Sequence, residues 1–205
     1  MVDDFIMGAV VFGQNAWGVV SRPYETYRRL TKQPRYSELL YLGLVLVLYF
    51  AAASLVKTAS FRPFLLTRQF MALLLGALGG YGLSVGIFYL VGRIVGGKGS
   101  LKSLIVGWGY TLLPTVMWFL ATSLLYVVLP PPRTQSAAGI LFSIVYLAFS
   151  LMMLAWKLTL AYLTLRFGLK LDLARIGLVA LIALCAWGAY SAGMYSLGVF
   201  RIPFL

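Results

Sequence analysis

The chain has 205 residues, of which 61% are hydrophobic and 11% are charged, and its mean hydropathy is +0.92. A soluble domain is about 45–50% apolar and about a quarter charged, so this composition excludes a soluble globular protein and indicates an integral membrane protein. The sequence has no histidine, one cysteine and five acidic residues. It therefore excludes histidine-dependent catalysis, intrachain disulfides and zinc sites built from cysteine and histidine.

Residues 1–36 form a separate N-terminal segment ahead of the first long apolar run. Apolar residues recur in it at helical spacing, namely Phe5, Ala9, Phe12, Ala16 and Val20. This spacing favours an interfacial helix on the inner leaflet, whereas Gly8, Gly13 and Gly18 leave an irregular segment as the alternative. Asp3 and Asp4 stand where a secretory signal would be basic, so we expect a cytoplasmic or interfacial segment.

The remaining chain, residues 37–205, is expected to form one transmembrane domain. It contains five apolar stretches long enough to cross a hydrocarbon core of about 30 Å as helices. The predicted spans are residues 39–56, 69–92, 103–129, 137–165 and 176–199. Pro130, Pro131 and Pro132 end the third span. The sequence thus predicts an all-α, polytopic membrane protein with five transmembrane helices.

Basic residues are distributed unequally between the two sides of these spans, with eleven on one side and five on the other. Because cytoplasmic loops carry the excess of lysine and arginine, we expect the N-terminus in the cytoplasm and the C-terminus outside. The basic residues lie at the ends of apolar runs and not in one polar patch or stripe. This distribution argues against nucleic-acid binding despite the formal net charge of +12.

The loop after the second span, Gly96-Gly97-Lys98-Gly99-Ser100, approaches a phosphate-binding P-loop. Gly99 separates the lysine from the serine and no strand precedes the loop, so the pattern does not predict nucleotide binding. We interpret it as a flexible glycine turn in which Lys98 and Lys102 meet lipid phosphates.

Lys157 is the charged residue inside a predicted span, where burial of a charge costs at least about 2.5 kcal/mol. It lies roughly 13 Å from the boundary at Arg166. A lysine that snorkels to the headgroups and a buried lysine with a partner are therefore both open. Pro114 leaves the carbonyl of Tyr110 without its helical donor at a similar depth, and we expect Lys157 to face the bundle interior and meet this backbone.

Further polar residues on neighbouring spans come out close to the level of Lys157. The hypothetical binding cluster comprises Lys157, Tyr110, Thr111, Pro114 and Ser84. Such a cluster would bind a headgroup or an ion, or satisfy broken helix backbone. Cys185, on the fifth span, is predicted to be a small core residue.

Two sequence blocks resemble the YIP family, the Ypt/Rab-interacting membrane proteins. They are residues 20–30, VSRPYETYRRL, followed by Pro34, and residues 96–102, GGKGSLK, followed by GYTLLP at 109–114. The resemblance covers roughly residues 20–200 and implies a five-helix layout with a cytoplasmic N-terminus and no catalytic residues. Eukaryotic members are implicated in Rab GTPase contacts through a long polar N-terminal segment. This chain has about 36 such residues, which makes Rab binding doubtful and is typical of the short prokaryotic members.

These observations favour a non-enzymatic membrane scaffold or accessory subunit in a prokaryotic plasma (inner) membrane. Its expected partners are the lipid bilayer and another membrane protein or a second copy of itself, with no cofactor, metal or catalytic residue. Transport is the alternative, alone as a homo-oligomer or within a larger transporter, with a site at Lys157 and Pro114. An intramembrane enzyme is disfavoured because no predicted span contains aspartate, glutamate or histidine.

Overall fold

The computed structural model describes residues 2–57, 63–128 and 137–197, which are helical and contain no strand. The elements in chain order are α1 (Val2–Ser21), α2 (Pro23–Lys32), α3 (Ser37–Lys57), α4 (Pro63–Ile94), α5 (Leu101–Tyr110), α6 (Leu112–Val128), α7 (Ala137–Leu163), the π-helix η1 (Thr164–Gly168) and α8 (Leu173–Ser196). The predicted all-α fold class is confirmed, and the N-terminal segment begins with a helix and not with irregular chain.

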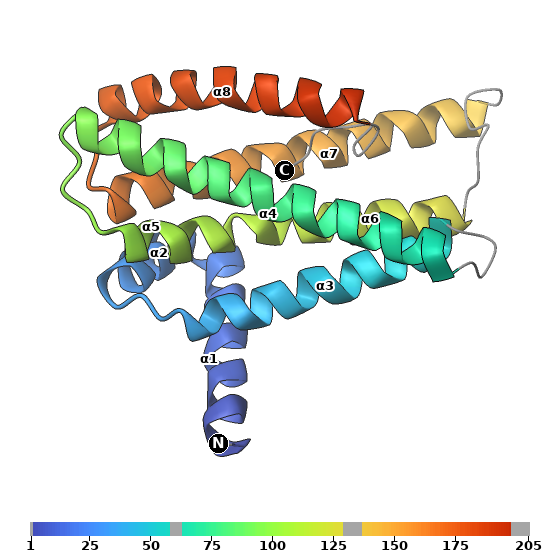
Figure 1. Ribbon diagram of the computed structural model, residues 1–205, viewed down its shortest axis with the longest axis horizontal. Helices are drawn as coiled ribbons and strands as arrows, with labels where there is room; N and C mark the ends of the chain where they lie inside the picture. The colour runs from blue at the N-terminus through green and yellow to red at the C-terminus, as the bar shows by residue number, and fades with distance from the viewer. Residues whose placement is uncertain (1, 58–62, 129–136, 198–205) are drawn as a thin grey trace.

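The long helices α3, α4, α6, α7 and α8 run along the long axis of the molecule (Figure 1). Among the described residues, four helical stretches are long and apolar enough to cross a membrane, namely Phe70–Ile94, Leu101–Leu125, Gly139–Gly168 and Leu173–Ser196. The described apolar part of α3, Ser37–Ala52, is shorter. The predicted ends of the third and fifth spans, including Pro130–Pro132, lie outside the described residues.

The third predicted span is broken into two helices at Thr111. Pro114 has no N–H to donate to the carbonyl of Tyr110, so the helical hydrogen-bond ladder cannot continue through this turn. The chain tightens instead, since the backbone N–H of Thr111 donates to the carbonyl of Trp108 at 3.1 Å. The hydroxyl of Thr111 donates to the same carbonyl at 2.7 Å. The backbone disruption predicted from Pro114 is therefore confirmed.

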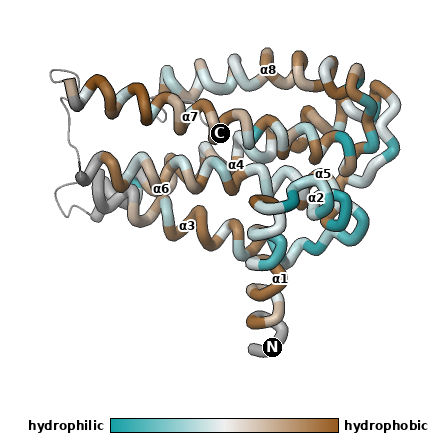
Figure 2. Tube along the Cα trace, turned by 180° about the vertical axis from the view of Figure 1, so that it is seen from behind, coloured by the Kyte–Doolittle hydropathy of each residue, from teal (hydrophilic) through white to brown (hydrophobic). Residues whose placement is uncertain are grey.

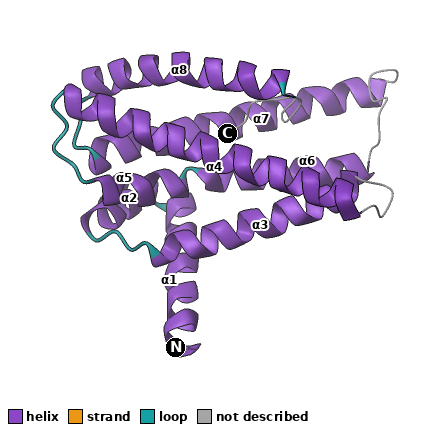
Figure 3. Ribbon diagram, viewed as in Figure 1, coloured by secondary structure: helices purple, strands orange, loops and turns teal. Residues whose placement is uncertain are grey.

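One end of the bundle carries α2, the loop after α4, η1 and the turn before α8, and Figure 3 shows these loops close together. We call it the basic end, because Arg28, Lys32, Lys98, Arg166 and Lys170 lie there. Hydrophilic residues gather at this end in Figure 2, whereas the far halves of the long helices are mostly apolar. The polar surface of the molecule is thus concentrated at the basic end.

The buried core lies in the same half of the molecule. One cluster of buried residues joins the second half of α4, α5 and the first half of α8, and includes Phe88, Trp108 and Val179. A second cluster joins α1 and α2 to α5 and the end of α7, and includes Tyr27 and Leu160. Outside this second cluster α1 projects away from the bundle, across its long axis (Figure 1). The helices and loops of the basic end are therefore packed against the buried core.

Candidate functional site

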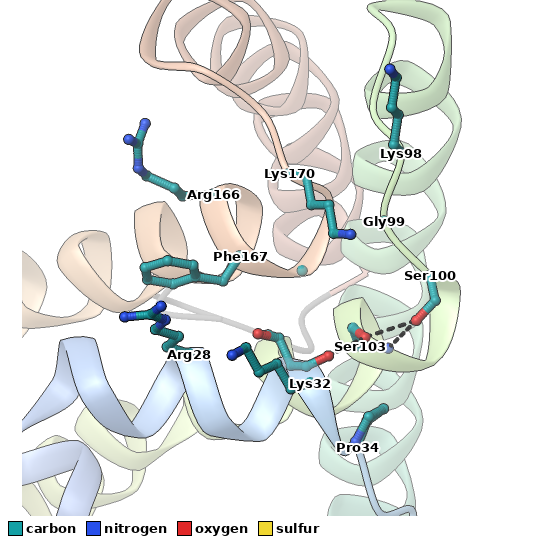
Figure 4. Close-up of a pocket in the computed structure, with 12 residues that line it drawn as sticks. Arg28, Lys32, Pro34, Lys98, Gly99, Ser100, Ser103, Arg166, Phe167 and Lys170 are labelled. Atoms are coloured by element: carbon teal, nitrogen blue, oxygen red, sulfur yellow. Dashed lines mark hydrogen bonds between the residues drawn. The ribbon is translucent and has the colours of Figure 1, made fainter.

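A cavity of about 510 Å³ opens at the basic end between α2, the loop after α4 and η1. Its described lining contains five basic residues and no acidic one. Two of the basic residues come from α2, one from the loop, one from η1 and one from the turn after η1 (Figure 4), and they are Arg28, Lys32, Lys98, Arg166 and Lys170. The cavity therefore combines three chain segments far apart in the sequence.

The glycine loop forms one wall of the cavity because it packs directly on the chain after η1. The backbone N–H groups of Lys98 and Gly99 both donate to the carbonyl of Leu169 at 3.1 Å. A Cβ atom on Gly99 would lie 1.7 Å from the carbonyl oxygen of Gly168, a distance that no side chain tolerates. Gly96 has a φ of +90°, which also favours glycine. The prediction of a flexible loop is therefore wrong, because backbone hydrogen bonds and close contacts hold the loop against the chain after η1.

Hydrogen bonds between α2 and α5 fix the opposite wall. Ser103 donates from Oγ to the backbone carbonyl of Thr31 at 2.8 Å, and Ser100 caps α5 by accepting from the N–H of Ser103 at 3.1 Å. Tyr27 is fully buried and donates to the carbonyl of Gly107 at 3.2 Å. Burial raises the pKa of the Tyr27 phenol, so this hydroxyl remains a neutral donor. The position of α2 over the cavity is thereby set.

The five basic residues of the cavity have no anionic partner among the described residues. None of them forms an ion pair or a side-chain hydrogen bond there. Nearby Arg175 is different, because its Nε lies 3.3 Å from Oδ2 of Asp172. Lys102 is also outside the cavity, with its amine 4.8 Å from the centre of the Tyr36 ring. Of the two lysines predicted to meet lipid phosphates, the structure places Lys98 in this site and Lys102 beside an aromatic ring.

Lys157 is buried within the bundle, with 8% of its surface exposed. Its amine donates to Oγ1 of Thr115 at 2.9 Å. The expected inward orientation of Lys157 is confirmed, and its side chain does not adopt the alternative, snorkelling conformation. Within the described chain its hydrogen bond goes to the side chain that follows Pro114 and not to the carbonyl of Tyr110.

Tyr110 belongs to a different buried network, which is centred on Glu38. The Tyr110 hydroxyl and the Asn15 amide both donate to the Glu38 carboxylate, the amide at 2.8 Å. The Arg29 guanidinium donates to the side-chain amide oxygen Oδ1 of Asn15 at 2.6 Å. Glu38 is 3% exposed and is not among the site residues predicted from the sequence. Asn15, a polar residue within the apolar stretch of α1, is the signal that could have pointed to this network.

The remaining residues of the predicted cluster are also divided among separate hydrogen bonds. Ser84 donates to the carbonyl of Gly80 at 2.7 Å and accepts from the Trp187 indole at 3.0 Å. Cys185 is exposed on α8 and not part of the core, because the packed face of that helix is formed by residues such as Val179 and Ala183. The predicted five-residue cluster is therefore not a single hydrogen-bonded network. No group of three histidine, cysteine or acidic residues in the described ranges could hold a metal ion.

These features define a helical, polytopic membrane protein whose polar groups and buried core meet at one basic end. A family model described as the Yip1 domain matches residues 17–194, a range that contains the whole lining of the cavity. The chain belongs to the Yip1 family, as the two sequence blocks predict. No curated protein and no solved structure matches it.

Proposed function

We propose that this Yip1-family protein is a non-enzymatic membrane scaffold or accessory subunit that holds another membrane protein or a lipid at its basic end. The observation that supports this role is the pairing of its interior polar groups. Every buried side-chain nitrogen or oxygen in the described residues has a hydrogen-bond partner. Groups such as Glu38 and Ser84 are therefore engaged in packing, whereas the five cations of the cavity form no ion pair within the described residues and are within reach of a partner.

The proposed topology has five spans, formed by α3, α4, α5 with α6, α7 with η1, and α8, in a prokaryotic plasma membrane. Support for α3 as a span comes from its course beside the other long helices (Figure 1). The excess of basic residues supports a cytoplasmic basic end, with a cytoplasmic N-terminus and the C-terminus outside. A Ser100→Cys variant in a Cys185→Ala background tests the orientation with an impermeant maleimide. Labelling only from the cytoplasmic side is expected, and labelling only from outside would overturn the assignment.

Purification from native membranes, followed by mass spectrometry of proteins and lipids, tests the scaffold role. We expect a partner protein or lipid in a stoichiometric amount. The pure protein reconstituted in liposomes should give no more solute flux than empty liposomes. Flux supported by the pure protein, without a retained partner, would contradict the proposal.

Transport is the second candidate, and one observation favours it. Lys157 is a buried cation beside the helix break at Pro114, and broken helices form the sites of many transporters. If this candidate is correct, the purified protein should carry a solute across liposomes and Lys157→Met should abolish that flux. An unchanged flux in the variant would exclude Lys157 as the transport site.

A further inference from the structure

The basic end holds more positive charge in one place than its own structure neutralises. Like charges in a shared cavity repel one another, and the repulsion is offset only when a counter-charge is present. The described part of the chain supplies no carboxylate to the cavity lining. The cavity therefore fits an anion that comes from outside the chain.

The backbone around the cavity is arranged so that lysine side chains enter it from two sides. In Figure 4 the amine of Lys32 lies between α2 and η1 and the amine of Lys170 points from the turn after η1 toward the loop at Gly99, while Lys98 and Arg166 point outward from the rim. Lys170 has a φ of 58°, in the left-handed region that lysine rarely adopts. Strained backbone of this kind persists where the surrounding structure holds it and is concentrated at ligand sites.

The position of the cavity narrows the class of anion. Its walls begin where the apolar helices end, since α4 stops at Ile94 and the span Gly139–Gly168 ends in η1. This is the level at which lipid phosphates lie, and basic pockets at the ends of transmembrane helices bind phosphate-bearing headgroups. A nucleic acid would need an extended basic stripe, whereas this site is a single cavity of about 510 Å³.

We infer that the cavity binds a phosphate group, carried either by an anionic lipid headgroup or by a free phosphate. Lys32 and Lys170 supply the inner contacts, and Arg28, Lys98 and Arg166 add positive charge around them. The inference deepens the proposed scaffold function by naming a ligand. The inference rests on the proposed function only in placing the cavity at the cytoplasmic leaflet. The binding of phosphate itself does not depend on the scaffold role.

The test variant combines Lys32→Gln with Lys170→Asn, because asparagine tolerates the left-handed backbone at position 170. With about 1 kcal/mol for each lysine near a lipid surface, the double variant should bind about 30-fold more weakly, equivalent to about 2 kcal/mol. Lys102→Gln, which removes one charge from the same end but outside the cavity, is the matched control for Lys32→Gln alone, and it should bind as the wild type does. A variant that combines Lys32→Arg with Lys170→Arg keeps both charges and should retain binding.

Native mass spectrometry of the detergent-solubilised full chain measures the binding of phosphatidylglycerol, phosphatidylcholine and inorganic phosphate. If the wild type binds phosphatidylglycerol more strongly than phosphatidylcholine and the double variant loses this binding, the ligand is a lipid headgroup. If instead the wild type binds inorganic phosphate and the double variant loses that binding, the ligand is a free phosphate. Melting temperatures in lipid-free detergent, compared with that of the wild type, show whether each variant is folded.

Equal phosphatidylglycerol and phosphate binding by wild type and double variant would overturn the inference, as would an equal loss in Lys102→Gln. The proposed scaffold function fails separately. If the native partner is absent from the purified wild type while phosphate binding depends on Lys32 and Lys170, the scaffold proposal is contradicted and this inference is supported. If the partner is retained by both proteins but phosphate binding is unchanged, this inference alone is overturned.

Discussion

Replacing Gly99 by alanine adds a methyl group where the structure already has the backbone of the neighbouring turn. The new Cβ would lie 1.7 Å from the carbonyl oxygen of Gly168 and 2.5 Å from the Cα of Leu169. Both are backbone atoms, so no side chain can rotate away. The loop and the turn after η1 must therefore separate, and the two hydrogen bonds from Lys98 and Gly99 to Leu169 are stretched or lost.

The expected cost combines overpacking, about 1–3 kcal/mol, with two backbone hydrogen bonds at about 0.5–1.5 kcal/mol each. We expect Gly99→Ala to lower the free energy of unfolding by about 3 kcal/mol, and the melting temperature in detergent by about 6–12 °C. Gly177→Ala in α8 is the control, because a Cβ there meets nothing within 4 Å and alanine favours a helix by about 0.5–1 kcal/mol. Gly177→Ala should melt at or slightly above the wild-type temperature. A Gly99→Ala variant that melts no lower than the wild type would refute the close packing described for this loop.

Three further predictions concern the polar groups of the interior. A double-mutant cycle between Lys157→Met and Thr115→Val should give a coupling energy of about 0.6–1.7 kcal/mol in detergent unfolding, and additive effects would mean that their hydrogen bond contributes nothing. Glu38→Ala leaves two buried donors without their acceptor and, at about 1–3 kcal/mol each, should cost about 2–6 kcal/mol. Amide exchange in α1 should become faster, whereas the exposed Glu25→Ala should leave α1 unchanged. Burial raises the pKa of Tyr27 above 10.0, so the stability that the neutral phenol contributes is complete below about pH 10 and is lost as the pH rises above it. Tyr27→Phe should flatten the resulting fall in melting temperature above pH 10. The same fall in the variant as in the wild type would contradict the role given to the buried Tyr27 hydroxyl.

The properties that sequence predicts well here are those set by neighbouring residues in the chain. Apolar length identifies the long helices, and the missing N–H of Pro114 predicts a break in the third span. The depth of Lys157 leaves snorkelling and burial both open, and the orientation expected beside Pro114 is the one that the structure shows. In contrast, the burial of Glu38 depends on α1 folding back so that Asn15 meets α3. Such long-range pairing depends on how the helices are rotated and packed, which apolar length alone does not specify.

The cavity was beyond sequence reasoning for a related reason. The loop containing Lys98 is recognisable as a glycine-rich turn, but its partners lie in α2 and η1, which are distant in the chain. In the π-helix Thr164–Gly168 the hydrogen bonds span five residues, one more than in an α-helix, so the helix is locally wider. It presents Arg166 and Phe167 to the cavity at the end of a long, mostly apolar span.

The helix break at Thr111 also separates two mechanical parts of the molecule. On one side of it most residues of α5 are buried at the basic end, whereas on the other no residue of α6 after Trp118 is buried among those whose side chains the structure describes. A bilayer whose hydrocarbon thickness differs from the helix length is accommodated by tilting or bending of the spans. We expect that tilt to occur in α6 and the outer half of α7, while α5 stays fixed to α2 and η1. The same protein can then sit in thick or thin bilayers without deforming the cavity at its other end.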